Sequence, residues 1–489
     1  MDCYGLWKIR DKDIIGNLSI NEKNKIFLTL DDIERTLSEL PVIYGKTNNG
    51  DAILLDNRMT EILPLKTKYF SNYAIFLKKG NFELININTR YFEVKYKLPN
   101  LEQWLNILKF ENLYYDNENF EYNNNLLEKD NIIKLVSIEN ILLINDDNIK
   151  IYIQFEKGLN RYLVEENKNL NSFYYEPYIH IEYKKPKKLE EIDQDILMIN
   201  RFFALMIGFA EEIPYYFVYL NDGSYKNEIQ VYTRFCFSVN TEYRQAYKYN
   251  EFIKYSKIKN DINILFSNWY KLYKNEEYRM IFNFYFLPNI VEEEKYLNVC
   301  KSLESLYNIK NMVYRDEIEN KEVIKEINDI LFNNSNIKQE LNDFLVKNKL
   351  SSQKKNAKKF TDDIPKVILS YFYNRYLVKI TFGKKIQEFD ELKIYEDNFC
   401  INDIYNPKKD IDNNYDYAGN TRNYLTHLSK VDATFKEEFV VKYSMIINLI
   451  FLNELFKDLE ISEENRKKII LNENSYMMIN IKYKSIEES

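Results

Sequence analysis

Residues 13–30, "DIIGNLSINEKNKIFLTL", contain two short apolar runs separated by a polar segment. In "DIIGNLSI" and "KIFLTL" apolar and polar residues alternate, which is the period of a strand with one buried face. The intervening "NEKN" is rich in asparagine and charge, which is typical of a hairpin turn. This stretch therefore predicts two antiparallel strands.

The same alternation continues to about residue 185. "YAIFLKK" and "FELININ" flank Gly80, and later "NIKIYIQFEKG" and "YEPYIHIEYKK" follow the same pattern. One helix is expected around "NLEQWLNILKFEN". Many short alternating segments with polar turns between them predict an antiparallel sandwich or barrel.

The period then changes from two to between three and four. The segment near 189–211 places apolar residues at helical spacing, namely Ile192, Ile196, Ile199, Phe203, Met206 and Ile207. After two further strand-like segments, helical patterns continue from about residue 241. We therefore expect an α+β chain with a β-rich domain over 1–240, a helical connector over 241–290 and an all-helical domain over 291–489.

The charge and the cysteines limit the possible functions. The formal net charge is −7, which disfavours a protein that coats nucleic acid nonspecifically, although a local basic cleft is compatible with it. The four cysteines are scattered without a C-x-x-C pair and predict reduced thiols rather than a zinc site or a disulfide framework. No motif for a metal or another cofactor is present, and none is expected.

Two long apolar stretches raise the question of a membrane. "DILMINRFFALMIGFAEEI" is interrupted by Arg201 and Glu211, and "FVVKYSMIINLIFLNELF" by Lys442 and Glu454. Neither offers about 18 uninterrupted apolar residues, so buried helices are expected rather than membrane spans. The first residues become charged before any apolar run develops, which argues against a signal peptide. The expected location is the cytoplasm.

One of the two histidines lies in "TRNYLTH", residues 421–427. The polar segment before it ends at Gly419, so Asn420 or Thr421 is expected to cap a helix whose first turn holds Arg422 and Asn423. Asn423 and His427 then share one helix face. A helix N-terminus, a guanidinium and an imidazole together would bind a phosphate. The alternative is a half-buried histidine whose ring caps a neighbouring group.

The "RNYLTH" element resembles the R-x(4–6)-H motif of HEPN-superfamily ribonucleases, in which a polar residue often follows the arginine. More narrowly, the chain resembles ApeA-like anti-phage defence proteins, in which a β-rich domain precedes a C-terminal HEPN domain. The family's N-terminal "G-x-W" and "G-x-L" elements are matched by Gly5 with Trp7 and by Gly16 with Leu18. "YLNVCKSLESLYN" matches the leucine–glutamate pair of the first HEPN helix.

The HEPN resemblance implies metal-independent cleavage of RNA by attack of the 2′-hydroxyl on the adjacent phosphorus. His427 would exchange the proton, since imidazole titrates near neutral pH. Arg422 would stabilise the phosphate charge, and Asn423 would orient His427 or contact the phosphate. The resemblance also implies a homodimer, which would bring two histidines to one composite site. The RNA partner, such as a tRNA or another structured RNA, and the phage-derived trigger are not identified by the sequence.

Further residues have a functional and a structural interpretation each. Glu304 matches the helix-1 glutamate of the family and would orient the arginine, or it forms an ordinary salt bridge. Tyr424 would stack on a base, or it packs in a core. A lysine cluster would contact the RNA backbone, or it is a solvated loop; it comprises Lys354, Lys355, Lys358 and Lys359. His180, in "YIHIEY", is expected to be structural.

Three hypotheses follow. The first is an endoribonuclease of an anti-phage, abortive-infection system whose β domain restrains or triggers cleavage. The second is a catalytically silent RNA-binding or dimerisation module coupled to a sensor. In the third, the β domain recognises a carbohydrate or phage protein and the helices transmit the signal.

Overall fold

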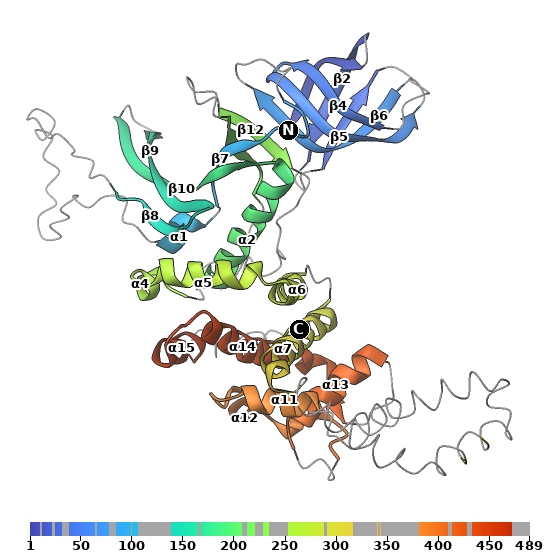
Figure 1. Cartoon of the computed structure of the whole chain (residues 1–489), viewed down its shortest axis with the longest axis vertical. Helices are drawn as coiled ribbons and strands as arrows, with labels where there is room; N and C mark the ends of the chain where they lie inside the picture. The colour runs from blue at the N-terminus through green and yellow to red at the C-terminus, as the bar shows by residue number, and fades with distance from the viewer. Residues whose placement is uncertain are drawn as a thin grey trace, which may run out of the picture. The chain divides into compact units, whose positions relative to one another are not determined.

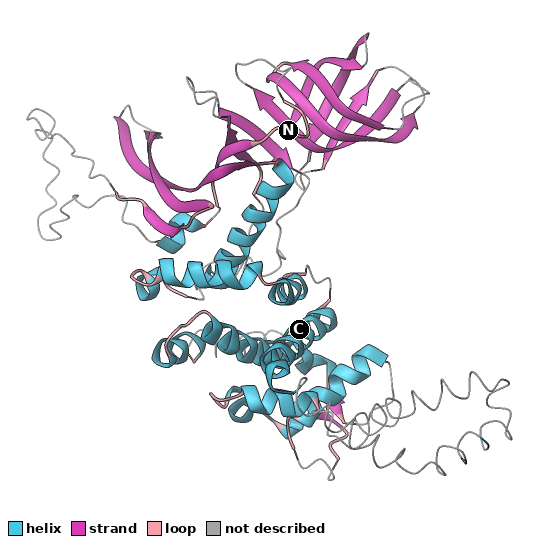
Figure 2. Cartoon of the chain, in the orientation of Figure 1, coloured by secondary structure: helices cyan, strands magenta, loops and turns pink. Residues whose placement is uncertain are grey.

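The computed structural model describes residues 1–9, 12–21, 25–31, 39–63, 66–77, 85–98, 100–105, 138–164, 168–207, 213–220, 228–233, 253–287, 291–315, 340, 343, 381–408, 413–427 and 433–471. The chain divides into two compact units, Met1–Tyr273 and Lys274–Ser489. The first unit contains the strands of a large sheet and the second is mainly helical (Figures 1 and 2).

Six antiparallel strands at the start of the first unit close into a barrel. They are β1 (Asp2–Ile9), β2 (Lys12–Ile20), β3 (Ile26–Leu30), β4 (Glu39–Thr47), β5 (Gly50–Leu63) and β6 (Lys66–Leu77). Their order is β3-β2-β1-β4-β5-β6, and β3 also pairs with β6. The predicted hairpin is confirmed, because β2 and β3 pair from Gly16 opposite Leu30 to Ile20 opposite Ile26.

The glycines around Trp7 make room for its ring in the barrel core. Trp7 is fully buried, and its indole Nε1 donates a hydrogen bond to the carbonyl of Gly16 at 3.2 Å. Gly45 lies opposite Trp7 on β4, where a Cβ would come within 2.3 Å of the ring. Gly5 has a different constraint, since its Cβ would be 2.4 Å from the backbone carbonyl oxygen of Lys46 on β4. Close packing around the Trp7 ring therefore explains Gly45, and the close approach of two strands explains Gly5.

The sheet continues beyond the barrel through the second half of β6, which pairs with β12. The added strands are β12 (Glu228–Thr233), β11 (Tyr216–Tyr219), β7 (Tyr91–Tyr96), β10 (Lys168–Lys187), β9 (Ile149–Val164) and β8 (Ile141–Asn145), in that spatial order. The first unit is therefore a closed barrel whose sheet continues as an open antiparallel sheet (Figure 2).

One predicted strand is wrong in its described part. Residues 85–88 of "FELININ" form a turn instead, in which the backbone N–H of Thr89 donates to the carbonyl of Asn86 at 3.0 Å. The Asn86 side chain also accepts from the backbone N–H of Asn88 at 2.8 Å. Local bonding by asparagine competes with a sheet ladder and decides the conformation here.

Helix α2 (Leu189–Ile207) contacts strands β6, β11 and β12 of the sheet. Its six apolar residues at helical spacing are all buried, as predicted. Asp193 is also buried on this helix and accepts hydrogen bonds from Tyr73, Tyr216 and Thr233. These hydroxyls come from β6, β11 and β12, so one carboxyl joins α2 to three strands.

The boundary between the units lies later than the expected end of the β-rich domain at residue 240. Helix α5 (Ile262–Lys274), which follows the short α1 (Leu101–Leu105) and α4 (Tyr255–Ile258) in the chain, packs on α2. Trp269 donates to the carbonyl of Met198 at 3.0 Å, and Arg201 donates to the hydroxyl of Tyr273 at 2.8 Å. The region expected as a connector, 241–290, is thus divided between the units, because its aromatic residues complete the core around α2.

The second unit is built around two long helices. α7 (Glu292–Arg315) packs against α14 (Glu437–Asp458). The others are α6 (Glu276–Tyr285), α11 (Phe382–Phe389), α12 (Ile394–Asn398), the 3₁₀ turn η3 (Ile401–Asp403), α13 (Asp416–His427) and α15 (Glu463–Ile470). Of the helices predicted between residues 321 and 380, only residues 340 and 343 are described, and both are helical; the rest lies outside the described residues.

The helical unit contains a short sheet and one long apolar helix. β13 (Ile404–Tyr405) pairs with β14 (Thr434–Phe435), so the expectation of a purely helical domain is corrected by a two-stranded sheet. In the described part of the chain, α14 is long and apolar enough to cross a membrane, and 78% of its apolar window is buried within the structure. That burial is typical of a core helix.

Candidate active site around Arg422 and His427

Helix α13 carries Arg422 and His427, but it begins earlier than the sequence predicted. It starts at Asp416, after a turn in which the N–H of Asp416 donates to the carbonyl of Asn413 at 3.0 Å. Gly419 and Thr421 are therefore inside the helix, and the predicted N-cap at Asn420 or Thr421 is wrong. Arg422 lies in the second turn, so the helix N-terminus does not contribute to a phosphate site there.

The buried face of α13 anchors the helix. Tyr296 on α7 donates its hydroxyl to the carbonyl of Ala418 at 2.9 Å. Thr421 Oγ1 donates to the carbonyl of Tyr417 at 2.8 Å and accepts from the backbone N–H of Phe435 at 2.8 Å. These bonds tie α13 to both α7 and β14. They fix the helix so that the next residue, Arg422, faces α7.

Arg422 and Glu304 form an ion pair between α13 and α7. Arg422 Nη2 lies 2.7 Å from Glu304 Oε2, and the two side chains are 31% and 26% exposed. Arg422 Nη1 also donates to Asn423 Oδ1 at 3.2 Å. A guanidinium has five N–H donors. Two of them have these partners, and the others have none among the described residues.

The remaining predicted residues of α13 are exposed. Asn423, Tyr424 and His427 are all accessible to solvent, and Tyr424 is 37% exposed. His427 is the last residue of the helix, and no described residue bonds to its ring. Asn423 lies four residues before His427, on the same helix face, but its side chain contacts Arg422 instead. The structure thus excludes a core-packing role for Tyr424 and a buried role for His427.

Lys385 is a site residue that the sequence reasoning missed. It lies on α11, and its Nζ is 2.9 Å from Glu304 Oε1 and 3.1 Å from Asn308 Oδ1. A signal was present, since Lys385 falls on the apolar face that Phe382, Ile386 and Phe389 define at helical spacing. A lysine on such a face needs a buried partner, because an isolated ammonium is costly to desolvate.

A buried thiol lies one turn before Glu304. Burial raises the pKa of Cys300, while Tyr296 and Arg422 oppose that effect. The thiol therefore stays protonated and is no nucleophile. Cys3, Cys300 and Cys400 are free thiols in the structure.

The lysine cluster predicted to contact RNA lies outside the described residues; it comprises Lys354, Lys355, Lys358 and Lys359. His180, by contrast, is described and lies on β10 with only 7% of its surface exposed. Its Nδ1 bonds to the hydroxyl of Tyr152, and its Nε2 is 3.4 Å from Glu93 Oε2. These are the surroundings of a structural histidine.

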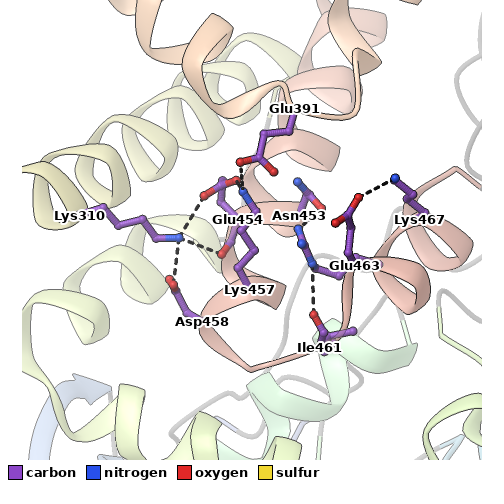
Figure 3. Close-up of polar contacts among 10 residues, drawn as sticks. Lys310, Glu391, Asn453, Glu454, Lys457, Asp458, Ile461, Glu463 and Lys467 are labelled. Carbon is purple, nitrogen blue, oxygen red and sulfur yellow. Dashed lines mark hydrogen bonds and ion pairs between the residues drawn. The ribbon is translucent and has the colours of Figure 1, made fainter.

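A second ionic cluster lies farther along α7 (Figure 3). Lys310 Nζ is 3.1 Å from Glu454 Oε2 and 2.9 Å from Asp458 Oδ1. Lys457 bridges Glu454 and Glu391. Each acid of this cluster has a cation beside it, and the cluster holds α7 to α14.

Among the described residues, no group of three histidine, cysteine or acidic side chains is arranged to hold a metal ion.

Comparison with known families concerns the first unit. The model of ApeA N-terminal domain 1 matches residues 2–269, which is more than half of the chain. The chain belongs to the ApeA N-terminal domain 1 family. The matched range ends within α5, four residues before the ApeA unit ends at Tyr273. The structure and the family match therefore agree that α5 belongs with the strands.

Membership of the ApeA family supports an anti-phage defence protein. Trp7 with its surrounding glycines, the element that suggested the family, lies in the core of the ApeA barrel. No curated protein and no solved structure matches the chain. The helical unit, which carries Arg422 and His427, lies beyond the matched residues.

Proposed function

We propose that the chain is a metal-independent endoribonuclease of the HEPN type that acts in anti-phage defence. The observation that carries this proposal is the ion pair between Arg422 and Glu304. Arg422 lies on α13, and the same helix carries the exposed His427. A guanidinium held at one edge by a carboxylate is oriented, yet keeps donors for a phosphate. The exposed imidazole can approach a substrate without unfolding any part of the unit.

The reaction breaks one phosphodiester bond and forms another. A base removes the proton of the 2′-hydroxyl while its oxygen attacks the adjacent phosphorus. The bond from phosphorus to the 5′-oxygen breaks, and an acid gives that oxygen a proton. The products are a 2′,3′-cyclic phosphate and a 5′-hydroxyl. His427 supplies proton transfer, and Arg422 stabilises the negative charge that grows on the non-bridging oxygens.

Such a reaction uses both an acid and a base, but the helical unit has one histidine. Two subunits with twofold symmetry would bring two copies of His427 to one phosphate. We therefore propose a homodimer with a composite site, located in the cytoplasm and acting on an RNA. The ApeA domain would restrain this activity until infection, because a constantly active ribonuclease would harm its host.

The first test compares wild type with Arg422→Ala and His427→Ala. Cells that express each protein are challenged with phage, their extracts are incubated in EDTA, and new 5′-hydroxyl ends in total RNA are counted. Wild type is expected to cut, and both variants are expected to lose cutting and phage protection while keeping their fold. Arg279→Ala is the matched control, since Arg279 is an exposed helical arginine in an ion pair with Glu276. Full protection by His427→Ala would instead support the silent RNA-binding module.

The second test concerns the composite site. Wild-type subunits are co-expressed with an increasing share of His427→Ala subunits, and cleavage is measured at constant total protein. If each site needs two intact subunits, the total activity falls with the square of the wild-type fraction. A linear fall would contradict the composite site while leaving the ribonuclease proposal in place.

A further inference from the structure

The ammonium group of Lys385 also contacts the carboxylate that holds Arg422. The two oxygens of Glu304 have different partners: Oε2 is 2.7 Å from Arg422 Nη2, and Oε1 is 2.9 Å from Lys385 Nζ. Three helices meet in this chain of charges, since the three residues lie on α13, α7 and α11. Glu304 is the only described link between the two cations.

Lys385 is held in this position with few alternatives. Only 10% of its side chain is exposed, and its Nζ also donates to Asn308 Oδ1 at 3.1 Å. The ring of Tyr307 lies 5.5 Å from the ammonium. A buried ammonium of this kind stays charged only when acceptors surround it. Lys385 therefore cannot swing away from Glu304 without losing the partner that compensates its charge.

The packing of α11 against α13 sets this arrangement. Thr381 caps α11 by accepting from the backbone N–H of Lys384. Two residues before Lys385, Gly383 lies so close to α13 that a Cβ would be 2.7 Å from the carbonyl oxygen of Tyr415. This close approach brings Lys385 and Arg422 to the same carboxylate.

The count of charges has a consequence for phosphate binding. Arg422 and Glu304 alone would be a neutral pair, with little attraction for a polyanion. With Lys385 the cluster carries one net positive charge. Two acids on the neighbouring helices bond to hydroxyls rather than to these cations: Glu388 accepts from the hydroxyl of Tyr307, and Asp416 accepts from Thr381 Oγ1 at 3.3 Å.

We propose that Lys385 is a positioning residue of the Arg422 site. It holds one oxygen of Glu304, so the other oxygen orients Arg422. It also compensates the charge of Glu304, so the guanidinium keeps its attraction for the scissile phosphate. This inference rests on the proposed ribonuclease function, and it concerns a residue that touches no substrate.

The test uses Lys385→Met in the full chain, with Lys310→Met as the matched control. Both lysines are partly or fully buried, lie in the helical unit and bridge two oxygen acceptors, but Lys310 contacts Glu454 and Asp458. Lys385→Met is expected to lower kcat for RNA cleavage about 10- to 100-fold, the range typical when a residue that orients a site group is lost. Lys310→Met is expected to lower thermal stability and leave kcat within about threefold.

A double-mutant cycle distinguishes positioning from general damage. In a Glu304→Gln background, Lys385→Met is expected to lower kcat by less than about threefold, because the carboxylate through which it acts is gone. A full and independent loss in that background would overturn the inference. Lys385→Gln, which keeps a donor and removes the charge, replaces the methionine variant if that protein does not fold.

The outcomes separate the two proposals. If wild type cuts RNA and Lys385→Met cuts as well as Lys310→Met, the role of Lys385 is disproved and the ribonuclease proposal stands. If wild type cuts no RNA in phage-challenged cells, the ribonuclease proposal is disproved, and the role of Lys385 with it.

Discussion

The two histidines of the chain, one in each unit, have opposite surroundings. His180 lies in the ApeA domain, buried on β10, with the hydroxyl of Tyr152 at one ring nitrogen and the carboxylate of Glu93 near the other. His427 lies at the exposed end of α13 in the helical unit. The residue type is the same, so burial and partners decide what each can do.

The comparison extends to the charged groups of the two units. Asp193 of the ApeA domain is only 1% exposed and accepts hydrogen bonds from three hydroxyls. The half-buried pair of Arg422 and Glu304 lies at the surface of the helical unit. Polar groups that are enclosed and satisfied hold a fold together, whereas polar groups held at one edge can also bind a ligand.

The largest expected effect separates the two histidines. His427→Gln should lower RNA cleavage at least about 100-fold, because a proton-transferring group is lost. The thermal stability of the His427→Gln variant should not change, since His427 is exposed. His180→Gln should keep cleavage within about twofold but lose about 1–3 kcal/mol of stability, because Glu93 and Tyr152 lose a buried partner. Single-turnover cleavage and denaturant unfolding measure the two effects. Equal cleavage by both variants would break the comparison.

The pH dependence of stability tests the enclosed carboxyl. Burial raises the pKa of Asp193 to about 7, with the three hydroxyl donors opposing that rise. Between the ordinary value near 3.9 and about 7, the folded state therefore binds a proton that the unfolded state lacks. The stability from this group is present below about pH 4 and is lost as the pH rises to about 7, by on the order of a few kcal/mol.

Asp193→Asn should remove this pH dependence, because the amide has no proton to lose. Tryptophan fluorescence during unfolding by urea at pH 5 and pH 7.5 is a suitable measurement. All three tryptophans, Trp7, Trp104 and Trp269, lie in the ApeA unit. A variant with the same pH dependence as wild type would show that another group is responsible.

Two glycines sharpen the comparison within the helical unit. Gly383→Ala would place a Cβ 2.7 Å from the Tyr415 carbonyl oxygen and should cost about 1–3 kcal/mol, with weaker cleavage because α13 is displaced. Gly419→Ala makes ordinary contacts with Gly383 N at 3.5 Å and Phe382 Cβ at 3.8 Å, and should be neutral or stabilise α13 by up to about 1 kcal/mol. Circular dichroism during heating would detect both changes. A stable Gly383→Ala protein would show that α11 and α13 can separate without cost.

The smallest expected effect concerns two threonines of α13. Thr421→Val leaves the buried N–H of Phe435 without its acceptor and should cost about 1–2 kcal/mol. Thr426→Val should change stability by less than about 0.5 kcal/mol, because exposed Thr426 bonds only to the carbonyl of Arg422 in its own helix. Denaturant midpoints of the two variants provide the measurement, and equal midpoints would contradict the anchoring role of Thr421.

Local patterns predicted much of the fold. Alternation identified β2 and β3, and helical spacing identified the buried face of α2, since one buried face is visible in the order of residues along the chain. The same patterns gave a wrong prediction at Asn86, where local hydrogen bonds form a turn instead of a strand. They also placed the start of α13 too late, because the helix begins before Gly419. Asparagine and glycine permit several conformations, so their neighbours decide.

The sequence by itself supplied the residues proposed to do chemistry, an arginine and a histidine in one short segment, and the Trp7 element that suggested the ApeA domain. The family resemblance suggested that Glu304 would orient Arg422, but only the tertiary structure decided the contact between them and added Lys385 to it. These residues are separated by 118 and 37 positions along the chain from Arg422, and no local period records such a contact. Helix packing brings them together, because the ammonium of Lys385, which is 10% exposed, needs the carboxylate of Glu304 beside it.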